Sequence, residues 1–350
     1  MRMLLALVLL LLPSPAYAQF VTYVSIAAEN RIAVFSMDSN TGKLNHQSNI
    51  KTSGSPGALY ISHDGRFVFA SIRSMGRLAS FRRSDNGDLK LIGEVPAGAD
   101  PAFVATDRAG KFLLTAYYFA GKVTVHKINK DGSLGKKPLQ SIPTKDKAHA
   151  IMADASNRFV FVPHTGPNAI FQFKLDATTG KLSANSPLVL STPPNSGPRH
   201  LWFHPKNPNI VYFDNEQESS VTLYRMSKSG KLRPVQTLST LPPGYKKSNS
   251  NAHLEMSPDG RFVYASNRGH DSIAGFQVDA KSGKMKSIGQ FKTEPTPRSF
   301  NISPDGKFLV AAGQGSGKLA IFRIAKNGKL KRIGTQQAGK QAWWVEVTKR

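Results

Sequence analysis

The 350-residue sequence contains no cysteine, which excludes disulfides, cysteine-ligated zinc and thiol nucleophiles. Acidic residues are also scarce, because 22 Asp and Glu stand against 47 Lys and Arg, giving a formal net charge of +25. Without disulfides the fold must be held together by burial alone, and a chain of this length can bury a sufficient core.

Several ligand-binding and catalytic motifs are missing as well. The sequence has no HExxH or His-x-His pair, no P-loop, no G-x-G-x-x-G after a strand and no G-x-S-x-G. Acidic residues do not cluster, so we expect no bound metal and no cofactor. The positive charge indicates attraction to anionic surfaces or polymers, but no nucleic-acid-binding motif accompanies it, so nucleic acid is not an expected partner.

Long hydrophobic runs are limited to the N-terminus. Arg2 precedes an apolar run over residues 3–12, and Ala16-Tyr17-Ala18 then forms an A-x-A cleavage site. This pattern predicts a signal peptide over residues 1–18 and a mature chain with a net charge of 25 − 1 = +24. The apolar run is too short to cross a bilayer, and no later stretch is more apolar. We therefore expect an exported protein, periplasmic or secreted, without a membrane span.

What the sequence does contain is a repeat. A turn followed by an apolar run, as in SPDGRFVYAS at residues 257–266, occurs six times, with 45 to 52 residues between equivalent positions. The runs align on Phe67, Phe112, Phe159, Ile210, Phe262 and Phe308. A second marker is a Gly-x-Leu or Gly-x-Met hairpin tip, which occurs seven times. These tips are centred on Gly42, Gly87, Gly132, Gly180, Gly230, Gly283 and Gly328.

The unequal counts predict how the chain closes. Residues 22–35 match residues 68–81, so the first unit starts at its second strand, and residues 342–348 form a spare strand at the C-terminus. The two ends would complete one seventh unit. Repeats of this length with four short strands are typical of propeller blades, and their regular spacing argues against a β-sandwich. The sequence therefore predicts an all-β, seven-bladed propeller over residues 19–350, closed by the C-terminal strand pairing into the N-terminal blade.

The order of strands within a blade predicts where polar residues meet. The first and second strands are antiparallel and joined by the Pro-Asp-Gly turn, so the start of the first and the end of the second face the same mouth of the channel. Polar residues at first-strand starts are His149, Arg199, His200, His253 and Arg298. Polar residues at second-strand ends are His164, Asn215, Glu216, Asn267, Arg268 and Gln314. Blades two and three contribute Arg73, Tyr117 and Tyr118.

These residue types favour a site for an anionic, oxygen-rich small molecule. Arginine binds carboxylate or phosphate in a bidentate manner, and His and Glu transfer protons near neutral pH. We expect substrate-binding roles for His200, Asn215, His253, Asn267, Arg298 and Gln314. A single amide at a strand end is commonly structural, and convergence of many polar groups is what indicates a site. The remaining histidines lie on loops, turns or outer strands, and no function is assigned to His46, His63, His126, His204 and His270.

The sequence also resembles a known family. The most specific pieces are GPRHLWFHP at residues 197–205, Asn215-Glu216, QTL at residues 236–238, SPDGRFVYASNR at residues 257–268, residues 297–314 and the closing Trp-Trp-Val-Glu-Val. Together they are similar to the seven-bladed propeller lactonases, which include a cytosolic bacterial 6-phosphogluconolactonase and a fungal muconate-lactonizing enzyme. The resemblance covers essentially the whole mature chain and implies that His149, Arg199, Glu216 and Arg268 are catalytic.

The resemblance implies hydrolysis, or reversible closure, of a lactone of a sugar acid or similar hydroxy acid. Arg199 and Arg268 would hold the substrate's anionic group and carbonyl oxygen, and Glu216 or His149 would take a proton from the attacking water. The export signal departs from the cytosolic enzyme and leaves the substrate open. Two alternatives remain: a non-enzymatic propeller that binds an anionic ligand, a polysaccharide or a partner protein, and a muconate-type cycloisomerase. We expect a monomer.

Overall fold

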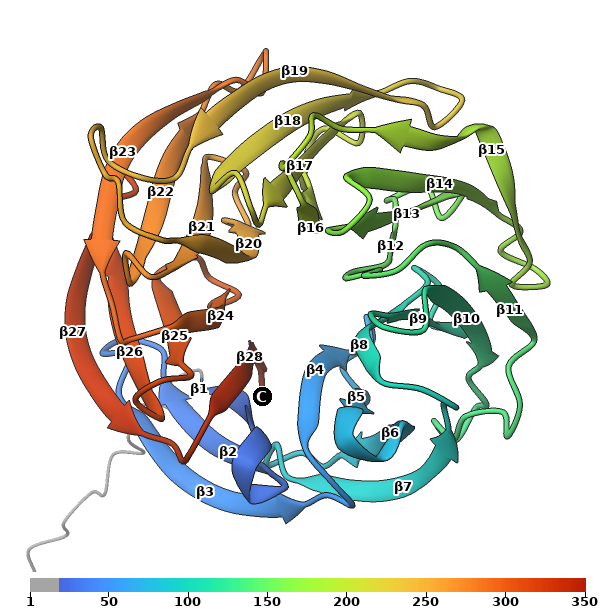
Figure 1. Cartoon of the computed structure of the whole chain (residues 1–350). Coiled ribbons are helices and arrows are strands. Elements are labelled where there is room, and N and C mark those ends of the chain that lie inside the picture. Colours follow the sequence, from blue (N-terminus) through green and yellow to red (C-terminus); the bar gives the residue numbers. More distant parts are fainter. Residues whose placement is uncertain (1–18) are drawn as a thin grey trace, which may run out of the picture.

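The protein is a ring of seven four-stranded antiparallel sheets, each forming one blade around a central axis (Figure 1). The structure, a computed structural model, describes residues 19–350, and the predicted signal peptide lies outside them. Helical structure in this range is limited to two single turns, η1 (Ala27–Glu29) and η2 (Arg73–Met75). No helix in residues 19–350 has the length and apolar character needed to cross a membrane. The predicted all-β propeller is confirmed.

Each blade supplies one strand to each of four concentric positions. The innermost strands are β28 (Ala342–Lys349), β4 (Pro56–Ile61), β8 (Pro101–Thr106), β12 (Met152–Ala153), β16 (Pro198–Phe203), β20 (Ser250–Met256) and β24 (Pro297–Ile302). The second strands are β1 (Gln19–Ile26), β5 (Phe67–Ile72), β9 (Phe112–Tyr117), β13 (Phe159–His164), β17 (Ile210–Asn215), β21 (Phe262–Arg268) and β25 (Phe308–Gly313).

The outer half of each blade carries the more exposed strands. The third strands are β2 (Arg31–Asp38), β6 (Arg77–Arg83), β10 (Lys122–Lys127), β14 (Ala169–Leu175), β18 (Ser220–Met226), β22 (Ser272–Val278) and β26 (Lys318–Ile324). The fourth strands are β3 (Leu44–Lys51), β7 (Leu89–Pro96), β11 (Gln140–Pro143), β15 (Leu182–Ser191), β19 (Leu232–Ser239), β23 (Met285–Lys292) and β27 (Leu330–Gln337).

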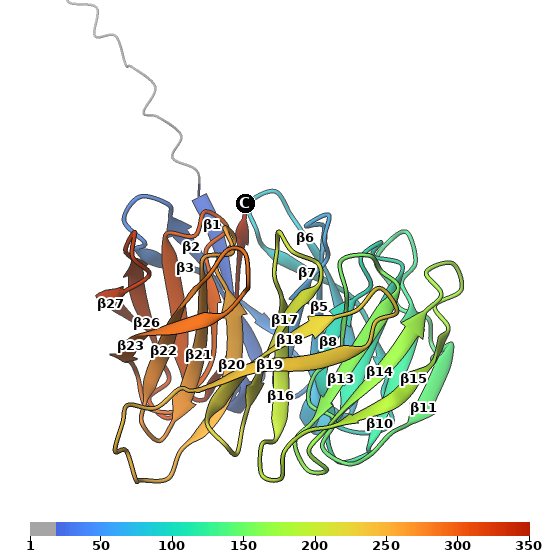
Figure 2. The same cartoon turned by 90° about the horizontal axis from the view of Figure 1, so that it is seen from above.

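The two ends of the chain share one blade, as predicted. Strand β28 pairs with β1 in antiparallel register, with Val345 opposite Val24, and so supplies the innermost strand of a blade whose other strands are N-terminal. The C-terminus consequently lies on one face of the ring, beside the start of β1 (Figure 2). This is the face that carries the turns between first and second strands, and we call it the turn face. Closure leaves β28 paired rather than as a free edge.

The two sequence markers contact each other between neighbouring blades. The hairpin-tip Gly132 has φ +88°, and a Cβ placed on it would lie 2.3 Å from the ring of Phe67 in the preceding blade. Gly180 meets Phe112 and Gly328 meets Phe262 in the same way. Both the left-handed backbone and the close approach require glycine. In five of the seven contacts the hairpin-tip glycine packs on a phenylalanine at the start of the preceding blade's second strand, and in the other two on Ile210 and Val21. This packing explains why the two markers repeat together.

Register along the innermost strands arranges the channel in layers. Leu201 lies opposite Phe213, and Leu254 opposite Ala265, at equivalent positions of their blades. In each blade, the residue two positions earlier in the innermost strand lies nearer the mouth. These residues are Gly57, Ala102, His149, Arg199, Ala252, Arg298 and Trp343. The residue one position later lies nearer the turn face. These residues are Tyr60, Ala105, Met152, Trp202, Glu255, Asn301 and Glu346. The arginines therefore lie toward the mouth and the carboxyl groups toward the turn face.

Candidate active site

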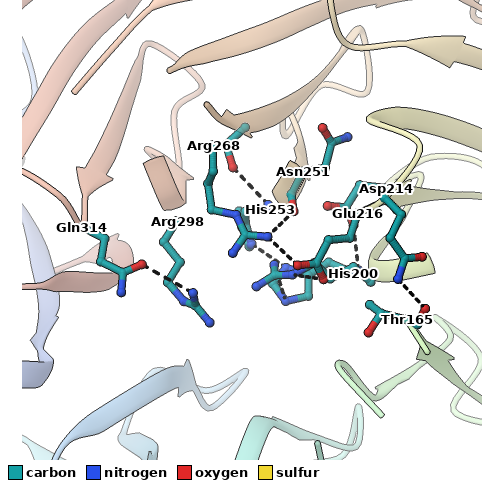
Figure 3. A network of polar contacts seen from close by, with 12 residues as sticks. Thr165, His200, Asp214, Glu216, Asn251, His253, Arg268, Arg298 and Gln314 are labelled. Atoms are coloured by element: carbon teal, nitrogen blue, oxygen red, sulfur yellow. Dashed lines mark hydrogen bonds and ion pairs between the residues drawn. The ribbon is translucent and has the colours of Figure 1, made fainter. Parts of the chain in front are cut away.

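The centre of the mouth is a carboxylate held by two arginines. Glu216 directly follows β17, and its backbone N–H donates to the Gly197 carbonyl at 2.7 Å. Arg268, at the end of β21, donates from Nη2 to Glu216 Oε1 at 2.6 Å (Figure 3). Arg199 on β16 places Nε 3.3 Å from Glu216 Oε2. Three of the four predicted catalytic residues are thus in direct contact.

The two arginines set the charge of this carboxylate. Burial alone would raise the pKa of Glu216, but Arg199 and then Arg268 outweigh it and hold the pKa below its ordinary value. Arg199 is itself buried, and burial lowers its pKa to about 10, which still leaves it protonated at neutral pH. Arg268 also donates to the Asn251 carbonyl at 2.9 Å. Glu216 is therefore ionised; its Oε1 accepts from Arg268, and its Oε2 has the ion-pair contact with Arg199 but no hydrogen bond within residues 19–350.

Arg298 is the mouth arginine without a carboxylate partner among residues 19–350. Its Nη1 donates to Gln314 Oε1 at 3.4 Å (Figure 3). Its guanidinium lies over the Trp343 ring at 3.9 Å. Arg73 also lies over Trp343, at 5.7 Å, but pairs with Asp100 at 2.8 Å. Burial, followed by repulsion from the other mouth arginines, holds the pKa of Arg298 well below its ordinary value. An anion next to Arg298 would relieve both effects.

His149, the fourth predicted catalytic residue, lies at the edge of this cluster as a neutral imidazole. Its ring packs edge-on against Tyr118, 5.5 Å between centroids, and against His200 at 5.1 Å. Burial first, and then Arg199 and Arg298, lower the pKa of His149 well below its ordinary value. Nδ1 is buried without a hydrogen-bond partner in the described chain. A neutral imidazole with a free nitrogen can accept a proton, which an engaged carboxylate does less readily.

His200 and His253 were predicted to bind substrate, and they lie one layer below the arginines. Arg199 Nη1 lies 3.3 Å from His200 Nε2, and the two Nδ1 atoms of His200 and His253 are 2.9 Å apart. Because a guanidinium can only donate, His200 Nε2 accepts, so its proton is on Nδ1 and donates to His253. Burial holds the pKa of His253 at about 3, with Arg199 contributing. Both rings pack against Trp344.

Three other residues of the predicted mouth are occupied by structural hydrogen bonds. Asn215 Nδ2 donates to Ser220 Oγ at 2.7 Å and Thr222 Oγ1 at 2.8 Å. Asn267 exchanges hydrogen bonds with Thr240 and is fully buried. His164 is buried between the Val162 carbonyl and the Thr144 hydroxyl. These hydrogen bonds stabilise strand ends, and the substrate-binding roles expected of Asn215 and Asn267 remain predictions.

Two residues of the mouth were missed from the sequence. Trp343 lies near the start of β28, the first strand of the closing blade. Extending the search at first-strand starts to β28 would have found it. Asp214 accepts the backbone N–H of His200 at 2.7 Å, and burial raises its pKa to about 6. Only the bulge that separates the Pro198 and Leu201 pairings turns this carboxyl toward the backbone of its neighbour, and the sequence does not signal it.

Residues 19–350 contain no group of three or more His, Asp or Glu side chains that could hold a metal ion. The fold and site define a seven-bladed propeller with a cationic channel mouth and one ionised, doubly paired carboxylate. Residues 18–347 match the family "Lactonase, 7-bladed beta-propeller". The chain belongs to this family.

Similar proteins cover nearly the whole chain. The 6-phosphogluconolactonase of Pectobacterium carotovorum is 32% identical over 331 residues, 94% of this chain and 98% of that protein. The protein of the same name from Xenorhabdus nematophila is 31% identical over 93% of this chain and 98% of its own length. Among solved structures, the periplasmic gluconolactonase of Pseudomonas aeruginosa has a TM-score of 0.88 at 25% identity, covering 94% of this chain and 99% of that one.

Proposed function

We propose that this protein is an exported lactonase that hydrolyses the lactone of a sugar acid at the channel mouth. The observation that carries the proposal is the cluster of Glu216, Arg199, Arg268 and Arg298 beside a neutral His149. Its relatives named 6-phosphogluconolactonase and gluconolactonase support the reaction class. An aldonolactone without phosphate is the favoured substrate, because the predicted signal peptide would place the protein outside the cytoplasm and a similar structure is a periplasmic gluconolactonase.

The mouth arginines have two different electrostatic roles in this proposal. Arg199 and Arg268 are paired with Glu216, so the triad is a rigid, preorganised positive edge. Arg298 lacks such a partner and is the cation that would receive the negative charge developing on the lactone carbonyl oxygen. A neutral lactone acquires this charge only as water adds, so Arg298 would stabilise the transition state more than the bound substrate.

His149 is the proposed general base. Water attacks the carbonyl carbon while its proton passes to the imidazole, and the carbonyl oxygen becomes an oxyanion facing Arg298. The tetrahedral intermediate then collapses, the ring C–O bond breaks, and the imidazolium returns its proton to the leaving oxygen. The product is the open hydroxy acid, whose carboxyl group then releases its proton to solvent and leaves as the carboxylate. Glu216 offsets the extra positive charge while His149 is protonated.

The test measures hydrolysis of a panel of lactones. Acid release is recorded by titration at constant pH, and the rate of spontaneous ring opening is subtracted. The panel contains δ-gluconolactone, 6-phosphogluconolactone and a muconolactone. The proposal predicts enzymatic opening of δ-gluconolactone, reduced at least about a hundredfold in His149→Ala. Muconolactone turnover alone would indicate the cycloisomerase, and no turnover of any lactone would indicate a binding protein.

A further inference from the structure

A separate cavity of about 430 Å³ occupies the turn-face half of the channel. Residues from all seven blades line it, and the catalytic cluster does not: neither Arg199, Glu216 nor Arg268 takes part. The rings of His200, His253 and Trp344 belong to its lining and lie between it and the mouth. His63 and Ala155 are exposed lining residues, so the cavity opens toward the turn face.

Most of the wall is aromatic. Phe103 and Trp344 contact each other at 5.6 Å between centroids, nearly perpendicular, and Phe103 also packs on His200. Tyr60 and Trp202 add further rings from two other blades. Ligand sites are commonly apolar hollows of this size with a few fixed polar groups. Flat aromatic faces in such a hollow suit the C–H faces of a saturated ring.

Besides its histidines and Arg108, the wall carries one carboxyl group, Glu346, and one amide, Asn301. Glu346 Oε1 accepts the Trp344 indole N–H at 2.8 Å. Behind it, Glu255 accepts from Asn301 Nδ2 at 2.9 Å and from the Ile302 N–H at 3.1 Å. Burial raises the pKa of Glu346 to about 8, and burial together with Glu346 raises the pKa of Glu255 well above its ordinary value. At neutral pH the Glu346 carboxyl is therefore mostly protonated and can both donate and accept.

The charge of the lining residues disfavours both cationic and anionic ligands. A cationic ligand would need an ionised carboxylate, and Glu346, the carboxyl group among the lining residues, is mostly protonated at neutral pH. Arg108 is the one guanidinium among the lining residues, and its Nε already donates to the Asp154 carbonyl at 3.2 Å. That hydrogen bond leaves the positive charge of Arg108 in place, but an anion would find this single cation in an otherwise neutral wall, so burying its charge there is costly.

We propose that this cavity is a second binding site, distinct from the catalytic mouth, for a neutral, hydroxyl-bearing ring compound of monosaccharide size. Glu346 would exchange hydrogen bonds with its hydroxyl groups while Trp202, Trp344 and Phe103 cover its apolar faces. Asn301 accepts from the Val347 N–H and donates to Glu255, so it would offer only its second Nδ2–H. The rings of His200 and Trp344 would form the floor, on the side away from Arg199. The site does not depend on the proposed lactonase reaction, because none of the catalytic cluster lines it.

The test is calorimetric titration of the purified protein with D-glucose and with myo-inositol, using sodium gluconate as the charged comparison. We expect saturable binding of one or both neutral probes at one site per chain, and weaker binding of gluconate. Ala155→Trp fills the opening from an exposed position and should weaken neutral-probe binding at least about tenfold. Ala280→Trp, at an exposed hairpin tip, is the matched control and should bind as the unaltered protein does.

A third variant separates this site from the mouth. Arg268→Ala removes part of the catalytic cluster and should leave neutral-probe binding within about twofold. Absence of saturable binding by both neutral probes would overturn the proposal. Binding that is lost in Arg268→Ala but retained in Ala155→Trp would also overturn it, because the probe would then occupy the mouth. Neither result would bear on lactone hydrolysis, which is measured separately.

Discussion

Glu216 shows how a single side chain acquires its role from its neighbours. An isolated buried glutamate would be protonated, but Arg199 and Arg268 keep this one ionised: Arg268 donates to Oε1, and Arg199 lies 3.3 Å from Oε2. That arrangement makes Glu216 a partner for cations more than a base, and it leaves Arg298 as the unpaired cation of the mouth. The sequence-based alternatives for the base, Glu216 or His149, are therefore resolved in our proposal toward His149.

The unpaired Arg298 yields a kinetic prediction. Arg298→Ala should lower kcat for δ-gluconolactone by about a hundredfold and change KM by less than about threefold, because a neutral lactone gains its charge only in the transition state. Steady-state kinetics at neutral pH measure both parameters. Lys329→Ala, on an exposed hairpin tip, is the control. A large rise in KM with unchanged kcat would mean that Arg298 binds the ground state instead.

The contact between a hairpin-tip glycine and the aromatic residue of the preceding blade is the recurring element of the fold. Gly132→Ala should lower the free energy of unfolding by about 2–4 kcal/mol, since a Cβ would lie 2.3 Å from the Phe67 ring in addition to the strain at positive φ. Gly110→Ala is a matched control, because Gly110 also has positive φ (+67°) but no atom within 4 Å of the added Cβ. Denaturant unfolding compares the two.

Equal losses for Gly132→Ala and Gly110→Ala would show that backbone strain alone requires these glycines. A larger loss for Gly132→Ala would show that packing between blades requires them as well.

How far the sequence predicts the structure depends on whether a feature follows from strand direction. Antiparallel strands and a countable repeat were sufficient to bring Arg199, Glu216 and Arg268 to one mouth and to pair residues 342–348 with the N-terminal blade. Asn215 and Asn267 occupy equally correct strand ends, yet local hydroxyl and backbone partners take their amides. The turn-face cavity was not foreseen, because its carboxyl groups lie within strands that read as apolar core.

For the molecule as a whole, the buried carboxyl groups link stability to pH. Glu346 has a pKa of about 8 in the folded protein, against 4.5 for an exposed glutamate. Between these values Glu346 binds more protons in the folded state than in the unfolded state, so its contribution to the free energy of unfolding falls as pH rises. Buried histidines with lowered pKa values act in the opposite direction up to about pH 6.5, so the fall should be clearest above that pH. Glu255 has a pKa shifted in the same direction, so it adds to this fall.

Glu346→Gln should remove part of this pH dependence. Glutamine keeps a neutral acceptor for the Trp344 N–H but cannot ionise, so the variant should gain melting temperature relative to the unaltered protein as pH is raised from about 6 to about 9. Thermal unfolding followed by circular dichroism at several pH values measures the gain. A difference in melting temperature that stays constant over this range would show that Glu346 is already ionised in the folded protein.

The central claim is that the arginine-rich mouth opens lactones, and Arg268→Ala tests it most directly. The measurement is kcat/KM for δ-gluconolactone in the variant and in the unaltered protein, with circular dichroism to show that both remain folded. We predict at least about a hundredfold loss in the folded variant, because Glu216 would lose its 2.6 Å partner and the positive edge of the mouth with it. Activity of Arg268→Ala near that of the unaltered protein would contradict the account.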